Sequence, residues 1–179
     1  MLVDGVDFPI PYSGRRFYTH KWKFLSALRY EVAVCILTGA IVWINGPYEP
    51  GIYNDIMIFR DALLHELEAG ERVEADDGYI GEAPQHVKCP KSIGSKPISE
   101  AMSSMVRRRH ETVNKRFKQW QILKAPFRGD IRDHGSIFRC VSIVTQLCID
   151  NGYPLFSVEY EDPDWENYYF DDDGTDDED

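Results

Sequence analysis

The segment from Leu28 to Asn45 constrains the fold of this chain more strongly than any other part of the sequence. It is rich in apolar and β-branched residues, and Thr38-Gly39 divides it into two parts. Residues 28–37 therefore predict a buried strand, Thr38-Gly39 a turn, and residues 40–45 the returning strand of a hairpin. The chain is expected to contain a sheet that includes this hairpin.

The remaining segments alternate between strand and helix patterns. The expected elements are a short strand at 1–10, a helix from Asn54 to Gly70, a short strand at 72–76, and helices at 99–123 and 135–149. Asn54 is a favourable N-cap, and apolar residues follow it at spacings of three and four. Proline and glycine indicate loops at 46–51 and 81–97. This order predicts an α/β fold with a mixed sheet flanked by helices.

Charge is distributed very unevenly along the 179 residues. Residues 159–179 contain 12 of the 30 acidic residues and no lysine or arginine, which leaves 18 acids and 20 bases in the rest of the chain. The net charge of −10 therefore hides a mildly basic body, which is compatible with a nucleic-acid partner. We expect one folded domain over residues 1–152 and an acidic, disordered tail over residues 153–179.

Membrane insertion and secretion are not expected. No apolar run approaches the roughly 20 residues of a membrane span, and the first residues lack the pattern of a signal peptide. The four cysteines form no C-x-x-C pair, and we expect them to be buried free thiols. These features predict an intracellular protein, nuclear or cytoplasmic.

Three acidic residues occupy positions from which carboxylates can converge. Asp4 lies on the first expected strand, Asp76 ends another strand, and Glu111 lies on the long helix. Clustered carboxylates repel one another unless a hard cation such as Mg²⁺ or Mn²⁺ neutralises them. Two such ions can activate a nucleophile and stabilise the leaving oxygen in phosphodiester cleavage. Taken singly, Asp4 could belong to a turn, and Glu111 could be a solvated helix residue.

A basic helix face surrounds Glu111. Arg107, Arg108, Lys115 and Lys118 lie three, four or seven positions away from it, so they share its side of the helix. This face predicts contacts with the phosphates of DNA, although an ordinary solvated helix surface has a similar composition.

Five stretches follow one another in an order and spacing that are more specific than any one of them alone. They are VDGVDFPI, KWKFLSALRYEVAV, IVWINGPYEPGIYNDIMIFR, GERVEADDGYIGE and HETVNKRFKQWQIL. Together, over Val3 to about Ile149, they resemble the catalytic domain of Harbinger-type and related DDE superfamily transposases. The resemblance implies an RNase H-like fold, a bound divalent metal and DNA as the substrate.

The resemblance also implies roles for individual residues. Asp4 corresponds to the first acid of the family, Asp76 to the acid of its A-D-x-G-Y motif, and Glu111 to its helical glutamate. Asp55 corresponds to a recurrent aspartate before the first long helix and is expected to be a supporting residue. As a first-turn carboxylate, Asp55 would also favour the helix dipole.

The chain departs from the family pattern at its start. Family members normally carry a DNA-binding region before the first acid, whereas three residues precede Asp4 here, and Gly5-Val6 replaces the more usual Gly-Thr. These departures indicate a fragment or a domesticated derivative. A separate DNA-binding transposon protein is therefore an expected partner.

Three functions are compatible with these features. The first is a metal-dependent DNA endonuclease or strand-transferase of transposon origin, and the three acids favour it. The second is a catalytically inactive derivative that binds DNA or protein, which the departures at the start favour. The third is an interaction protein that acts through its acidic tail, with the folded domain as a scaffold.

Overall fold

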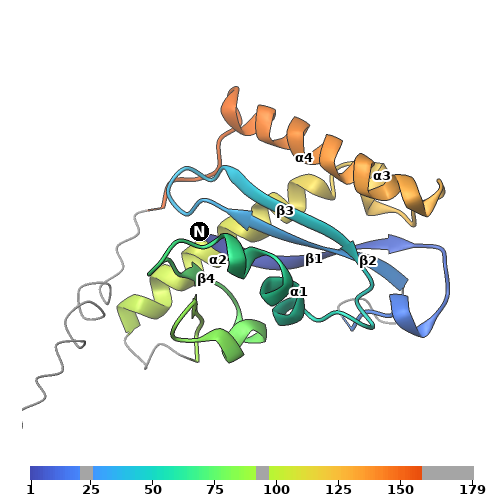
Figure 1. The fold of residues 1–179 in the computed structure, drawn as a ribbon. Coiled ribbons are helices and arrows are strands. Elements are labelled where there is room, and N and C mark those ends of the chain that lie inside the picture. The colour runs from blue at the N-terminus through green and yellow to red at the C-terminus, as the bar shows by residue number, and fades with distance from the viewer. Residues whose placement is uncertain (21–25, 92–96, 159–179) are drawn as a thin grey trace, which may run out of the picture.

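The computed structural model describes residues 1–20, 26–91 and 97–158, which form a five-stranded sheet flanked by helices (Figure 1). The strands are β1 (Leu2–Ile10), β2 (Ser26–Val34), β3 (Ile41–Tyr48), β4 (Val73–Glu74) and β5 (Val87–Lys88). Their order is β3-β2-β1-β4-β5, with β2 antiparallel to both of its neighbours and with β4 and β5 parallel to β1. The expected α/β fold with a mixed sheet is confirmed.

Helices cover both faces of the sheet. The α-helices are α1 (Asp55–Asp61), α2 (Pro97–Phe117), α3 (Gln121–Lys124) and α4 (His134–Asp150). Short 3₁₀ helices are η1 (Arg15–Phe17), η2 (Leu63–Glu66), η3 (Asp77–Glu82) and η4 (Ile131–Asp133). Helices α2, α3 and α4 lie on one face, and α1 and η3 lie on the other (Figure 1).

Successive side chains of β1 point to opposite faces of the sheet, which divides the core into two parts. Phe8 and its neighbours two positions away point toward α2, α3 and α4, whereas Val3 points toward α1. The first part includes Val6, Phe8, Ile10, Val113, Phe117 and Phe138, and the second includes Val3, Phe59, Leu63 and Tyr79. Because both faces of β1 and β2 are covered, nearly every residue of these strands is buried.

Several element boundaries differ from the prediction. Strand β3 continues to Tyr48 through Pro47, which was predicted to be loop. An edge strand tolerates proline because one side of its backbone has no ladder partner. The side chain of Asn54 caps α1 as expected, accepting a hydrogen bond from the Met57 amide at 3.0 Å, but the α-helix ends at Asp61. Strand β5 was also predicted to be loop.

The long helix α2 ends at Phe117, whereas the prediction extended it to residue 123. The chain turns there and enters α3, which brings Leu123 into the same core as Phe117. Trp120 lies at this turn and is 42% exposed, so it does not continue the buried side of α2.

The folded body continues to Val158, beyond the boundary expected at residue 152. Leu155 and Val158 are buried, and Val158 belongs to a small cluster with Leu2 and Ile36. The predicted tail residues 159–179 lie outside the described residues. Of the cysteines, Cys89 is buried as expected, but Cys140 and Cys148 are exposed on α4. In the described part of the chain, no helix is both long enough and apolar enough to cross a membrane.

Candidate active site

Asp4, Asp76 and Glu111 line one cavity of about 150 Å³. Leu2, Val3, Arg107 and His110 complete its described lining. The three acids come from different parts of the chain, so the fold brings them to one place. Among the residues that the structure describes, however, no three His, Cys, Asp or Glu side chains are grouped in a way that could hold a metal ion. The oxygen donors around the cavity suit a hard cation by chemistry, but they are not drawn together into a ligand set.

The strand register explains why Asp4 and Asp76 meet. Leu2 pairs with Glu74 in the parallel ladder between β1 and β4, so Asp4 lies two residues further along β1 and Asp76 two residues beyond the end of β4. Side chains two residues apart point to the same face of a sheet. The Asp76 carboxylate also accepts a hydrogen bond from the Gly78 amide at 2.8 Å, which caps η3 and orients the side chain.

Helix α2 supplies the third acid and a histidine. Glu111 is exposed on α2, whereas His110 is only 2% exposed and lies against the sheet. The Nε2 atom of His110 is 2.9 Å from the carbonyl oxygen of Val32, and Nδ1 is 3.1 Å from the side-chain nitrogen of Asn114. Nε2 therefore carries the proton and donates it to the carbonyl, and Nδ1 accepts from the Asn114 amide.

His110 also contacts the first acid. Its Nδ1 atom lies 3.7 Å from Oδ2 of Asp4, so the ring forms one wall of the cavity. Sequence reasoning did not include His110 among the site residues. The available signal was its spacing in the sequence. Position 110 comes four residues after Val106 and three before Val113, a spacing that predicts the apolar side of a helix.

Arg107 is the basic residue of the predicted DNA-binding set that reaches the cavity. Its Nη1 atom is buried and has no hydrogen-bond partner in the part of the chain that the structure describes. A buried guanidinium nitrogen in this position is suited to an anionic oxygen. Arg108 and Lys115 are exposed on α2, and Lys118 is half-buried; none of these three is among the described lining residues.

Asp55 lies on the opposite face of β1 from Asp4. Its Oδ1 atom is 3.1 Å from Nη1 of Arg29, and the same guanidinium donates to Asp7 at 2.7 and 3.0 Å. The side chain covers Gly5 so closely that a Cβ atom there would lie 2.1 Å from Asp55 Oδ1. Asp55 is not among the described residues that line the cavity. It belongs to a buried ion network on the other side of the strand that carries Asp4, and its supporting role stays a prediction.

Tyr79 and Glu31 extend this network beneath the sheet. Both side chains are almost fully buried, and the Tyr79 hydroxyl has no hydrogen-bond partner among the described residues. Burial raises the pKa of Tyr79 well above its usual range, and the negative charges of Asp55, Glu31, Asp4 and Asp76 raise it further. Burial also raises the pKa of Glu31 to about 7, although a hydrogen bond from Trp43 opposes the shift.

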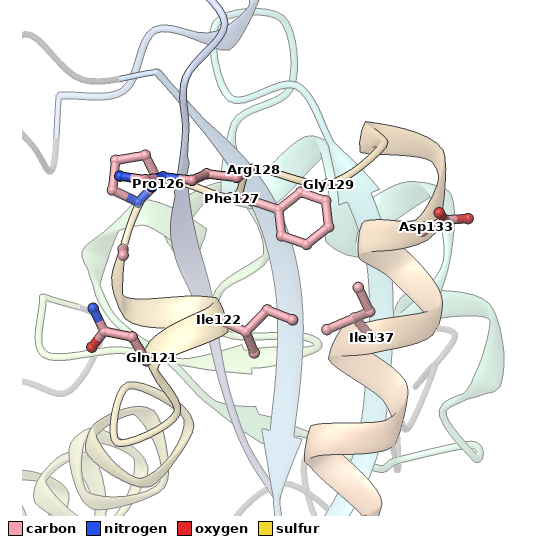
Figure 2. A pocket seen from close by; sticks show the side chains of 9 residues that line it. Gln121, Ile122, Pro126, Phe127, Arg128, Gly129, Asp133 and Ile137 are labelled. Atoms are coloured by element: carbon pink, nitrogen blue, oxygen red, sulfur yellow. The ribbon is translucent and has the colours of Figure 1, made fainter.

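A second, larger hollow of about 560 Å³ lies between α3 and the beginning of α4 (Figure 2). Ile122, Phe127 and Ile137 point toward one another across it, so its interior is apolar. None of the predicted site residues lines it among those described. The smaller cavity with the three acids is therefore the better candidate for chemistry.

Comparison with protein-family models, with characterised proteins and with solved structures finds no match to this chain. The resemblance to DDE transposases therefore depends on the five quoted stretches and stays a prediction.

Proposed function

We propose that this chain is a DDE transposase-like domain with an RNase H-like fold that cleaves DNA with the help of Mg²⁺ or Mn²⁺. One observation carries the proposal: Asp4, Asp76 and Glu111, which are far apart in the sequence, line one cavity. The sheet order β3-β2-β1-β4-β5, in which only β2 runs opposite to the other strands, supports the RNase H-like fold, whose sheet has this arrangement.

Each residue around the cavity has a chemical part in this proposal. Asp4, Asp76 and Glu111 would hold the divalent metal, which supplies Lewis-acid activation of water or a hydroxyl group when it is bound. Arg107 would bind a phosphate oxygen through its buried Nη1 atom. His110 would restrict Asp4 by packing, because its ring is held by Val32 and Asn114. Its Nδ1 atom, which accepts from Asn114, has no proton to donate to the Asp4 carboxylate.

Cleavage of supercoiled plasmid DNA with Mg²⁺ or Mn²⁺ tests the proposal. Asp76→Asn and Glu111→Gln keep the size of each side chain but remove its negative charge, so both should abolish cleavage and weaken Mn²⁺ binding measured by calorimetry. Circular dichroism should show an intact fold. The matched control is Asp77→Asn, since the neighbouring Asp77 pairs with Lys91 and is not a described lining residue.

The outcome of this experiment is unambiguous. Wild-type cleavage by Asp76→Asn, with the same dependence on metal concentration, would refute the proposed site. An equal loss in Asp77→Asn would show that the effect is not specific to the cavity.

A catalytically inactive DNA- or protein-binding module is the second candidate. The observation compatible with it is that, among the described residues, the three acids line the cavity without being drawn together into a ligand group. Salt-dependent DNA binding by a protein that neither cleaves DNA nor binds Mn²⁺ would select this alternative.

A further inference from the structure

The outer face of α4 is apolar although the inner face of the same helix already packs on the sheet. Phe138, Val141 and Ile149 are buried against the core, whereas Ile143 is 61% and Leu147 54% exposed. The exposed apolar residues of α4 are Cys140, Ile143, Val144, Leu147 and Cys148. Their spacings of three and four positions make one continuous stripe, which is the pattern of a helix face that packs against another element.

The apolar surface continues from α4 to the edge of the sheet. A groove of about 270 Å³ runs between the helix and β3, and Ile143 and Leu147 form one of its walls. Val42 of β3 lines the groove and is 50% exposed. Since β3 is the edge strand, no further strand of the described sheet flanks this groove.

Two charged residues mark the ends of the stripe. Arg139 and Asp150 are both exposed on α4 and lie eleven positions apart, which corresponds to about three helical turns, or about 16 Å. Eleven residues at about 100° each bring the two side chains to the same flank of the helix, about 20° apart. Their midpoint lies next to Val144, which is also the middle of the stripe from Cys140 to Cys148.

The sign of Asp150 is unfavourable for the helix that carries it, because it is the last residue of α4, at the negative end. Arg139 lies in the second turn of the N-terminal half. An antiparallel neighbouring helix reverses this relation, because its negative end lies beside Arg139 and its positive end beside Asp150. Pairing across a two-fold axis near Val144 also places each Arg139 opposite Asp150 of the other helix.

We infer that α4 is a homodimerisation surface on which a second copy of this chain docks its own α4 in antiparallel orientation. The charge pattern identifies the occupant. A two-fold axis that places Arg139 of one copy opposite Asp150 of the other also places Asp150 of the first copy opposite Arg139 of the second, so both pairs are attractive. The stripe and the adjoining groove are small beside the ~800 Å² per partner of a standard interface. The dimer should therefore be weak and concentration-dependent.

Sedimentation equilibrium of the full chain between low and high micromolar concentration tests this inference. The wild-type protein should pass from monomer to dimer over this range, and Leu147→Glu should weaken the dimer by at least tenfold. Because Leu147 is exposed, the monomer of this variant should keep its circular dichroism spectrum and melting temperature. Met57→Glu, at an exposed apolar position of α1 on the other face of the sheet, is the control and should leave dimerisation unchanged.

A charge exchange tests the antiparallel orientation. Arg139→Asp and Asp150→Arg should each fail to dimerise alone, since each places like charges opposite one another. Mixed in equal amounts, the two variants should form a heterodimer. One chain then carries a carboxylate at both ends of its stripe and the other a guanidinium at both ends, so opposite charges meet at each end.

Three results would overturn the inference. The first is a wild-type chain that stays monomeric at all concentrations. The second is a dimer that neither Leu147→Glu nor the single charge changes weaken. The third is a full chain that stays monomeric while a chain ending at Val158 dimerises, which would identify the acidic C-terminal segment as the occupant of α4.

Discussion

Replacing Glu31 with glutamine is expected to stabilise the protein at neutral and alkaline pH. The Glu31 side chain is 1% exposed, and its Oε2 atom accepts a hydrogen bond from the Trp43 indole at 3.0 Å. Its Oε1 atom has no partner among the described residues. Burial raises the pKa of this carboxyl from 4.5 to about 7; the Trp43 hydrogen bond lowers it, and the charge of Asp55 raises it.

The direction of the effect follows from the raised pKa. The folded protein holds this proton more tightly than the unfolded chain, so protonation of Glu31 favours folding. The stabilisation is complete below pH 4.5, is lost as the pH rises toward about 7, and stays lost above that. The difference between the two pKa values corresponds to about 3 kcal/mol, because each pKa unit is worth about 1.4 kcal/mol. Glutamine retains an oxygen for Trp43 and carries no charge.

Urea unfolding of both proteins from pH 5 to pH 8, followed by tryptophan fluorescence, measures this difference. The glutamine variant should gain least at pH 5 and about 3 kcal/mol at pH 8. Burial lowers the pKa of His134 to about 4, so protonation of His134 destabilises both proteins as the pH falls from 6.5 toward 4. That effect cancels in the comparison.

A control variant isolates the effect of burial. Glu66→Gln, at an exposed position in η2, should show no such dependence on pH. The same free-energy difference between Glu31→Gln and wild type at every pH, or a less stable glutamine variant at pH 8, would refute the reasoning.

Three further predictions address the site and its surroundings. Gly5→Ala should lower the free energy of unfolding by about 1–3 kcal/mol, because its Cβ would displace Asp55; an equally large loss in an Asp55→Ala background would contradict this explanation. His110→Ala should weaken Mn²⁺ binding by roughly 10- to 100-fold in a calorimetric titration, and unchanged affinity would show that the ring does not position Asp4. Deleting residues 159–179 should tighten DNA binding at low salt, since 12 acidic side chains would no longer compete with the phosphates; fluorescence anisotropy that shows no change would exclude this screening.

The sequence predicted the elements that carry long, regular patterns. The hairpin, the helix at the end of the body and the N-cap at Asn54 all depend on neighbours within a few positions, so they were accessible without the fold. The sharing of one cavity by Asp4, Asp76 and Glu111 depends on the β1–β4 register, which the sequence alone does not specify. The expected positions of the acids on two strands and a helix allowed them to converge, and the resemblance singled out the same three. Their metal-binding role stays a prediction.

The features that could not be predicted from the sequence depend on contacts between distant residues or on very short elements. Strand β5 has two residues, too few for any alternation to be visible. The burial of His110 depends on the Val32 carbonyl, which is 78 positions away. The end of α2 was missed because apolar residues continue at helical spacing through Trp120 and Leu123, although the chain turns between them and Phe117.

The candidate cavity joins an extensively paired strand of the sheet to one of the least paired. Strand β1 pairs with β2 along all nine of its residues, whereas Asp76 follows a two-residue strand with a single register position on β1. Amide hydrogens around Asp4 should therefore exchange only through global unfolding, and those around Asp76 through local opening. A ligand that needs all three acids then binds only to the fraction of molecules in which the β4 edge is docked. Substitutions that strengthen the contact between β4 and β5 would raise its affinity without touching a residue of the cavity.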